Sequence, residues 1–139
     1  MIPNTILLVD DDDTTNILNK FFAESLDDTI DVVTAVNGQE ALDFLEENDI
    51  EAIGPCFVVL DVLMPVMDGW EFLAEFNNRF SDKYKEQVTI SILTGLDSEK
   101  ISKQAKDNPL VHDTVQKPLS DAKFRELITK HYKEENLSQ

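Results

Sequence analysis

The sequence predicts an α/β fold, in which one five-stranded parallel sheet carries helices on both of its faces. Short, continuously apolar runs alternate five times with longer segments of helical periodicity along the 139-residue chain. Apolar runs without polar alternation are typical of strands buried on both faces, and the periodic segments supply the crossovers that parallel strands need. The clearest run, residues 57–60, ends on the carboxylate of Asp61 and is followed by the turn signals Pro65 and Asp68-Gly69.

Five strands are expected, at residues 6–9, 29–33, 57–60, 88–94 and 111–115. The first helix follows the run of four aspartates at residues 10–13, with Asp13 or Thr14 as its N-cap. A second helix opens at Asn37-Gly38, and a third begins after Gly69. Because parallel crossovers are right-handed, these elements predict a doubly wound sheet.

The later segments complete the alternation. Residues 77–85 are polar and predict a frayed helix end followed by a loop, whereas residues 98–106 predict a weakly apolar helix that is exposed or mobile. Ser120 is expected to cap the last helix. The apolar residues at helical spacing are Ile17, Leu18, Phe21, Phe22 and Leu26 in the first helix, Ala41, Leu42 and Leu45 in the second, Trp70, Phe72, Leu73 and Phe76 in the third, and Phe124, Leu127, Ile128 and Tyr132 in the last.

Composition limits the function classes. With 28 acidic and 12 basic residues, the formal net charge of −16 argues against binding to nucleic acid or to an anionic membrane surface. The lone Cys56 lies in an apolar strand and is expected to be a core residue in a reducing compartment. No run is long enough to span a membrane and no signal peptide is apparent, so we expect a cytoplasmic protein. A single domain over residues 1–139 is expected, with its core at about 5–132 and a loose polar tail at 133–139.

Polar side chains collect where the predicted strands end. Asp10 and Asp11 follow the first strand, Asp61 the third, Thr94 the fourth and Lys117 the fifth. The carboxyl ends of parallel strands share one edge of the sheet, so these side chains should converge there. Each pair of carboxylates about 5 Å apart would repel by roughly 3 kcal/mol at an effective dielectric constant of about 20. The cluster therefore implies a divalent cation, and oxygen ligands favour Mg²⁺ or Mn²⁺.

Two further side chains give this edge a possible chemistry. Lys117 supplies a positive charge and Thr94 a hydroxyl, which together with a cation could hold the oxygens of a phosphoryl group. Asp61 would then be the nucleophile that attacks phosphorus to form an acyl phosphate. Each residue alone has an ordinary explanation, such as capping a helix, and it is their combination at four strand ends that indicates a site.

These residues resemble the receiver domain of two-component response regulators, in its stand-alone, chemotaxis-regulator-like form. The resemblance covers residues 5–132 and rests on five pieces in the family's order and spacing. Those pieces are Leu8-Val9-Asp10-Asp11, Leu60-Asp61-Val62-Leu63-Met64-Pro65, Met67-Asp68-Gly69, Leu93-Thr94-Gly95 and Lys117-Pro118. The resemblance implies a flavodoxin-like sheet with strand order 2-1-3-4-5.

The resemblance also implies roles for individual residues. Asp61 would be the phosphoacceptor, and Asp10, Asp11, Asp61 and the backbone carbonyl of Leu63 would hold Mg²⁺ or Mn²⁺. Lys117 would pair with the phosphoryl oxygens, and Thr94 would swing to bond one of them. The donor would be a sensor histidine kinase or a histidine phosphotransfer protein, and the output would be a protein of unknown identity. The chain would act as a monomer or as a phosphorylation-dependent dimer. It would not be an enzyme beyond its own phosphorylation and slow autodephosphorylation.

One departure and several alternatives remain. The family often has an aromatic switch residue where this chain has Thr114, so the switch must work differently here. A receiver fold that binds partners without phosphorylation is the first alternative, although all five site residues are intact. A Mg²⁺-dependent phosphatase of the haloacid-dehalogenase type would need an aspartate in place of Leu63. A flavodoxin would need a loop rich in Ser, Thr and Gly after the first strand, where residues 10–13 are aspartates.

Overall fold

A computed structural model describes residues 2–95 and 99–132. It contains a five-stranded sheet in the order β2-β1-β3-β4-β5, and every neighbouring pair is parallel. This confirms the expected fold class and strand order. The strands are β1 (Thr5–Val9), β2 (Asp31–Ala35), β3 (Cys56–Asp61), β4 (Val88–Thr94) and β5 (Asp113–Gln116).

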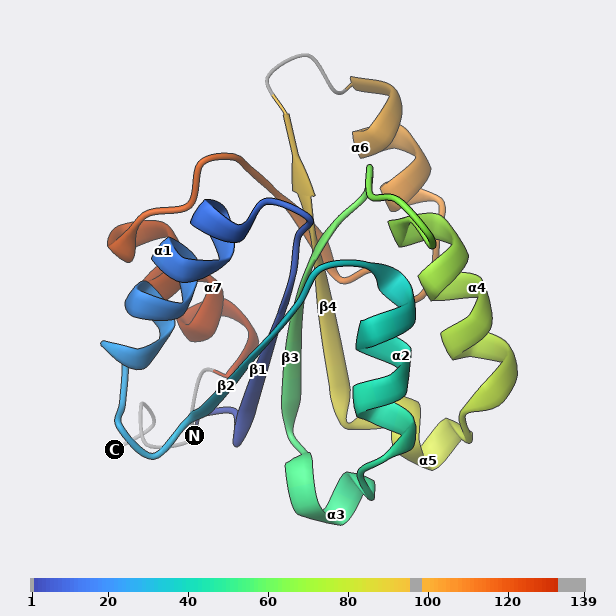
Figure 1. The fold of residues 1–139 in the computed structure, drawn as a ribbon, viewed down its shortest axis with the longest axis horizontal. Helices are drawn as coiled ribbons and strands as arrows, with labels where there is room; N and C mark the ends of the chain where they lie inside the picture. Colours follow the sequence, from blue (N-terminus) through green and yellow to red (C-terminus); the bar gives the residue numbers. More distant parts are fainter. Residues whose placement is uncertain (1, 96–98, 133–139) are drawn as a thin grey trace.

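Seven helices connect the strands within the described residues. They are α1 (Asp13–Glu24), α2 (Gly38–Glu46), α3 (Ile50–Ile53), α4 (Gly69–Arg79), α5 (Asp82–Glu86), α6 (Glu99–Lys106) and α7 (Asp121–His131). Figure 1 shows α1 and α7 on one face of the sheet and α2, α4 and α6 on the other. Among the described helices, none combines the length and apolarity needed to cross a bilayer.

The central strands are buried on both faces, which is why they lack polar alternation. Side chains at alternate positions of β1 and β3 enter two separate cores. One core, with α2 and α4, contains Leu7, Val58, Leu60 and Phe72, and the other, with α1 and α7, contains Ile6, Leu8, Phe57, Val59 and Phe124. Cys56 is fully buried, and this burial raises the pKa of its thiol to about 12. It is the core residue that the sequence predicted.

Several predicted helix and strand boundaries were wrong by a few residues. β2 begins at Asp31 rather than at residue 29, and β5 begins at Asp113 rather than at residue 111. The N-cap of α1 is Asp12, not Asp13 or Thr14. Residues 77–85 are not a frayed end and loop, because α4 continues to Arg79 and Ser81 then caps α5 by accepting a hydrogen bond from the Tyr84 N–H.

The orientation of α1 is the larger surprise. Its apolar residues do follow helical spacing, but Ile17, Leu18 and Phe21 are 71%, 48% and 65% exposed. Only Phe22 and Leu26 of the predicted set pack against the core. The inward positions are instead Asn16, Asn19 and Ala23. An amphipathic pattern locates a helix, but it does not by itself show that the apolar side faces inward.

Three predictions about the last part of the chain have different outcomes. α6 buries only Ala105 and half-buries Ile101, as its weak apolar pattern indicated. Ser120 caps α7 by accepting a hydrogen bond from the Lys123 N–H at 3.1 Å. The start of the predicted helix at Ser98 and the polar tail at 133–139 lie outside the described residues.

Candidate functional site

The register of the sheet places two aspartates side by side at its carboxyl edge. Val9 on β1 is aligned with Leu60 on β3, and the next residues of the two strands are Asp10 and Asp61. Asp11 follows directly. Ligand atoms of Asp10, Asp11 and Asp61 all lie within 4.8 Å of one another. The structure thus brings together the three carboxylates that the sequence predicted, here called the acidic cluster.

The turn after β3 fits closely beneath Asp61. The Gly69 N–H donates to the Val62 carbonyl at 2.8 Å, and a Cβ on Gly69 would lie 2.8 Å from the carbonyl oxygen of Asp61. Glycine is therefore required by close backbone approach. Asp68 caps α4 in a reciprocal capping box with Glu71. These contacts explain why Asp68-Gly69 follows the strand at this spacing.

The three carboxylates differ in burial. The Asp10 and Asp61 side chains are 3% and 10% exposed, whereas Asp11 is exposed. Oδ1 of Asp10 accepts from the Asp12 N–H at 2.9 Å, and Oδ1 of Asp61 accepts from the Val62 N–H at 3.0 Å. The cluster is therefore anchored on its inner side and open on the side of Asp11.

Lys117 lies against the acidic cluster. Its Nζ is 3.1 Å from Asp61 Oδ1 and 3.5 Å from Asp10 Oδ2. The Lys117 N–H donates to the Thr94 carbonyl at 2.8 Å, which ties the end of β5 to the end of β4. Thr94 itself is buried, and the acceptor for its hydroxyl is the Val115 carbonyl, 3.4 Å away. That distance is longer than the roughly 2.5–3.0 Å of a normal hydroxyl hydrogen bond, so the hydroxyl is weakly held.

Burial and charge both perturb the site. The pKa of Asp61 is raised because its carboxyl group is buried and because Asp10 lies beside it, and Lys117 only partly offsets these effects. Burial opposes the charge of Lys117, but its hydrogen bond to Asp61 and the nearby charges outweigh burial and raise its pKa. Perturbed carboxylates of this kind are concentrated at functional sites.

The donor set fits a hard divalent cation. Three carboxylates face a single ammonium group, so negative charge remains uncompensated when all are ionised. Oδ2 of Asp10 is buried and, apart from the long ion pair with Lys117 Nζ at 3.5 Å, has no hydrogen-bond partner among the described residues. A cation that binds oxygen ligands would satisfy it, as Mg²⁺ does in proteins. The contribution of the Leu63 carbonyl stays a prediction.

One residue that was not predicted as a site residue also lies at this edge. Asn16 of α1 donates from its amide to the Asp10 carbonyl. The large apolar side chains that are exposed among the described residues belong to two segments, α1 and the loop after β3. They are Ile17, Leu18, Phe21, Leu63 and Val66. The polar residues at positions 16 and 19, on the same side of the helix as Ala23, were the signal in the sequence that α1 faces inward with its amides.

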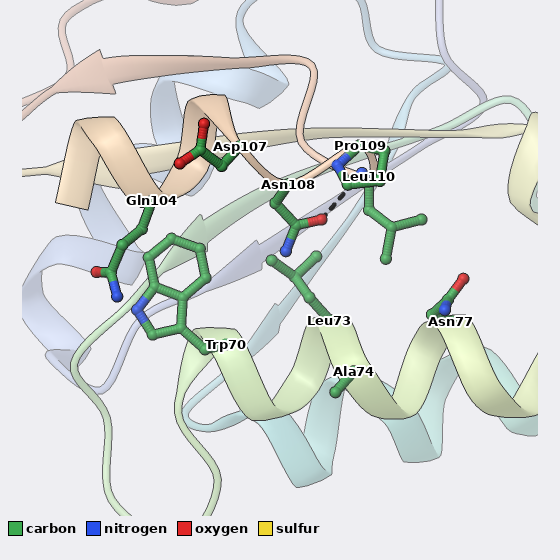
Figure 2. A pocket seen from close by; sticks show the side chains of 9 residues that line it. All are labelled: Trp70, Leu73, Ala74, Asn77, Gln104, Asp107, Asn108, Pro109 and Leu110. Atoms are coloured by element: carbon green, nitrogen blue, oxygen red, sulfur yellow. Dashed lines mark hydrogen bonds between the residues drawn. The ribbon is translucent and has the colours of Figure 1, made fainter.

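A hollow lies between α4 and α6, away from the acidic cluster. It has a volume of about 440 Å³, and none of the five predicted site residues lines it. Figure 2 shows the ring of Trp70 and the side chain of Leu73 on α4 facing Gln104 and Asn108. The hollow is separate from the acidic cluster.

Comparison with known proteins agrees with this geometry. The family model of the response regulator receiver domain matches residues 6–129. The probable C4-dicarboxylate response regulator DctR of Bacillus subtilis is 29% identical over 127 residues, which cover 91% of this chain and 51% of that protein. Hybrid signal transduction histidine kinase D of Dictyostelium discoideum is 33% identical over 103 residues, 74% of this chain but 6% of that protein. The chain thus spans about half of the first relative's length and a small part of the second's.

Solved structures show the same fold. A two-component response regulator from Cytophaga hutchinsonii has a TM-score of 0.80 at 24% identity, covering 96% of this chain and 100% of that one. A response regulator receiver protein from Dyadobacter fermentans has a TM-score of 0.79 at 22% identity, covering 92% of this chain and 97% of that one. With the family match over most of its length, the chain belongs to the response regulator receiver domain family.

Proposed function

We propose that this chain is a phosphoacceptor domain, in which Mg²⁺-dependent phosphorylation of Asp61 switches binding to another protein. The observation that carries the proposal is the convergence of Asp10, Asp11 and Asp61 within 4.8 Å, with Lys117 Nζ 3.1 Å from Asp61. This arrangement supplies a nucleophile, a cation site and a fixed positive charge at one point. Its relatives in the family are signalling domains rather than classical enzymes.

Asp61 is the proposed nucleophile. One of its carboxylate oxygens attacks phosphorus of a phosphohistidine, the phosphorus–nitrogen bond breaks, and the imidazole leaves with the bond's electron pair. The product is an acyl phosphate on Asp61. Bound Mg²⁺, held by Asp10, Asp11, Asp61 and the Leu63 carbonyl, would neutralise charge on the phosphoryl oxygens.

Lys117 and Thr94 would hold the product. Lys117 already contacts the Asp61 carboxylate and can shift its hydrogen bond to a phosphoryl oxygen. Thr94 holds its hydroxyl only weakly at the Val115 carbonyl, so rotating toward the phosphoryl group loses little. Thr114 offers no aromatic ring to follow this movement, so the output must use another residue or be weaker.

The phosphodonor is proposed to be a histidine kinase or a histidine phosphotransfer protein. The exposed apolar residues Ile17, Phe21 and Val66 support this, because they lie on the two segments that follow the acidic positions. Figure 1 shows α1 and the loop before α4 on the two sides of the carboxyl edge of the sheet. Exposed apolar surface of this kind marks protein interaction sites. A donor protein seated on it would reach Asp61.

The test is intact-mass measurement after incubation with Mg²⁺ and acetyl phosphate. Wild type should gain one phosphoryl group, and the gain should vanish with a chelator and in Asp61→Asn. Asp68→Asn is the matched control, because Asp68 is outside the acidic cluster and asparagine caps helices as well as aspartate does. That variant should be phosphorylated like wild type. No adduct with acetyl phosphate or with a phosphohistidine donor would favour a phosphorylation-independent interaction module instead.

A further inference from the structure

The buried side of α1 carries amides where a core helix would carry apolar residues. Asn16 and Asn19 are only 5% and 4% exposed. Burying an amide costs about 1–3 kcal/mol unless its polar atoms find partners. The two asparagines are one turn apart on the same helix, so their hydrogen bonds can be compared directly.

Asn16 bonds to the backbone beside the acidic cluster. Its Nδ2 donates to the Asp10 carbonyl at 2.8 Å and to the Ala35 carbonyl at 3.2 Å. The Asp10 N–H also donates to the Ala35 carbonyl, at 3.0 Å. The Asp10 carbonyl belongs to the peptide group that joins Asp10 to Asp11. One side chain therefore fixes the peptide plane between two of the three clustered carboxylates.

The other half of the same amide is not satisfied. Oδ1 of Asn16 is buried and has no hydrogen-bond partner among the described residues. An unpaired buried acceptor costs roughly 1–3 kcal/mol, which an apolar side chain would avoid. For packing alone, asparagine is a poor residue here. What it supplies is the pair of donors on the Asp10 and Ala35 carbonyls.

Asn19 lacks this connection. Among the described residues, no hydrogen bond joins Asn19 to Asp10, Asp11 or Ala35. The Asn16 N–H also completes the first turn of α1 by donating to the Asp12 carbonyl at 3.0 Å. The Asp12 N–H in turn donates to Asp10 Oδ1. Asn16 is therefore linked to Asp10 by its side chain, through the Asp10 carbonyl, and by its backbone, through Asp12.

We propose that Asn16 is a positioning residue, which holds the Asp10–Asp11 peptide so that both carboxylates converge with Asp61 on a divalent cation. The inference rests on the proposed function, because it assigns Asn16 to the same cation site. Without the two amide donors, the peptide plane is free to turn. The exposed Asp11 would then diverge from the two buried carboxylates.

Calorimetric titration of Mg²⁺ into the unphosphorylated protein tests this. Asn16→Ala should raise the Mg²⁺ dissociation constant by about tenfold. This is the lower end of the roughly 10–100-fold range for residues that orient metal ligands. Asn19→Ala is the matched control and should bind within about twofold of wild type. Urea unfolding without Mg²⁺ should show that both variants are destabilised, so that lost affinity is separated from lost stability.

Asn16→Leu covers the case in which Asn16→Ala does not fold, because leucine has a similar volume but carries no donor. It should lose Mg²⁺ affinity as Asn16→Ala does. Wild-type affinity in Asn16→Ala or Asn16→Leu would overturn the inference, as would equal losses at positions 16 and 19. A wild-type protein that binds no Mg²⁺ would overturn the cation site of the proposed function itself, and this failure would be visible before any variant is compared.

Discussion

Helices α1 and α4 have similar apolar patterns but use them in opposite ways. α4 buries Phe72, Leu73 and Phe76 in the core. α1 exposes Ile17 and Phe21 and buries two asparagines and an alanine. α1 begins at Asp13, close to Asp10 and Asp11, where backbone carbonyls at the sheet edge need donors. A helix beside a functional edge is thus patterned by that edge and by its partners as well as by the core.

The largest expected effect is on the free energy of unfolding, and it is measured by replacing one phenylalanine in each of the two helices. Phe72→Ala in α4 should lower the free energy of unfolding by about 3–5 kcal/mol, because it leaves a cavity in the core. Phe21→Ala in α1 should change it by no more than about 0.5 kcal/mol, because the ring is already exposed. Urea denaturation of both variants measures this. Equal losses would mean that Phe21 is packed against the protein.

Phe21→Ala also tests the proposed role of the exposed face. Phosphorylation by acetyl phosphate should keep its wild-type rate, because a small donor needs no docking surface. Phosphotransfer from a phosphohistidine protein should slow by about tenfold, the effect of losing roughly 1.4 kcal/mol of binding. If both rates are unchanged, the exposed apolar face of α1 does not contact the donor.

The next effect concerns the acidic cluster that α1 supports. Folding raises the pKa of Asp61 above its ordinary value of 3.8. At pH values just above 3.8 the folded protein therefore keeps a proton on Asp61 that the unfolded chain loses. The contribution of Asp61 to stability should therefore fall as the pH rises from about 3.8 toward neutral. Asp61→Asn should reduce this fall and be more stable than wild type at neutral pH without Mg²⁺. Thermal unfolding as a function of pH measures both; a less stable Asp61→Asn would contradict the account.

Mg²⁺ should reverse that order. At a concentration about 100 times its dissociation constant, a cation that binds only the folded state adds roughly 2.7 kcal/mol. Wild type should gain this stability, whereas Asp61→Asn, with one ligand charge removed, should gain much less. Repeating the unfolding measurements with Ca²⁺-free Mg²⁺ buffer and with chelator provides the comparison. Equal gains in the two proteins would place the cation away from Asp61.

A smaller effect is expected in the loop between β3 and α4. Val66 has a φ of 69° and is 80% exposed, although β-branched residues strongly disfavour positive φ. Replacing Val66 by glycine should relieve about 1–3 kcal/mol of backbone strain. Glycine also costs conformational entropy, so Val66→Gly should stabilise the protein by roughly 1 kcal/mol in total. The same variant should slow transfer from a protein donor if Val66 is a contact residue. A loss of stability on thermal unfolding would contradict the strain argument.

The smallest expected effect compares the N-caps of the two helices. Asp68 accepts a capping bond from Glu71, whereas the Asp12 side chain makes no capping bond to the backbone of α1. Asp68→Ala should cost about 1 kcal/mol and Asp12→Ala measurably less. Denaturant midpoints for the two variants, compared with wild type, provide the measurement. A larger loss for Asp12→Ala would show that the helix start beside the acidic cluster is the more tightly capped.

The sequence was sufficient where local patterns and chain order determine the outcome. Buried parallel strands lack polar alternation, so β1 and β3 were found, and their ends placed Asp10 and Asp61 at one edge. It was insufficient where tertiary context decides. Apolar spacing alone does not show that Ile17 faces outward, and no local pattern shows that Asn16 bonds two strand ends. Those features depend on what lies across the space from each residue.

Asp61 is proposed to receive a phosphoryl group from phosphohistidine when Mg²⁺ is present. The most direct measurement is peptide mapping by mass spectrometry after transfer from a phosphohistidine donor protein, with borohydride reduction to mark the acyl phosphate. We expect the modified residue to be Asp61, and we expect chelator to abolish the modification. A mark on Asp10 or Asp11, or none with a donor shown to be phosphorylated, would contradict it.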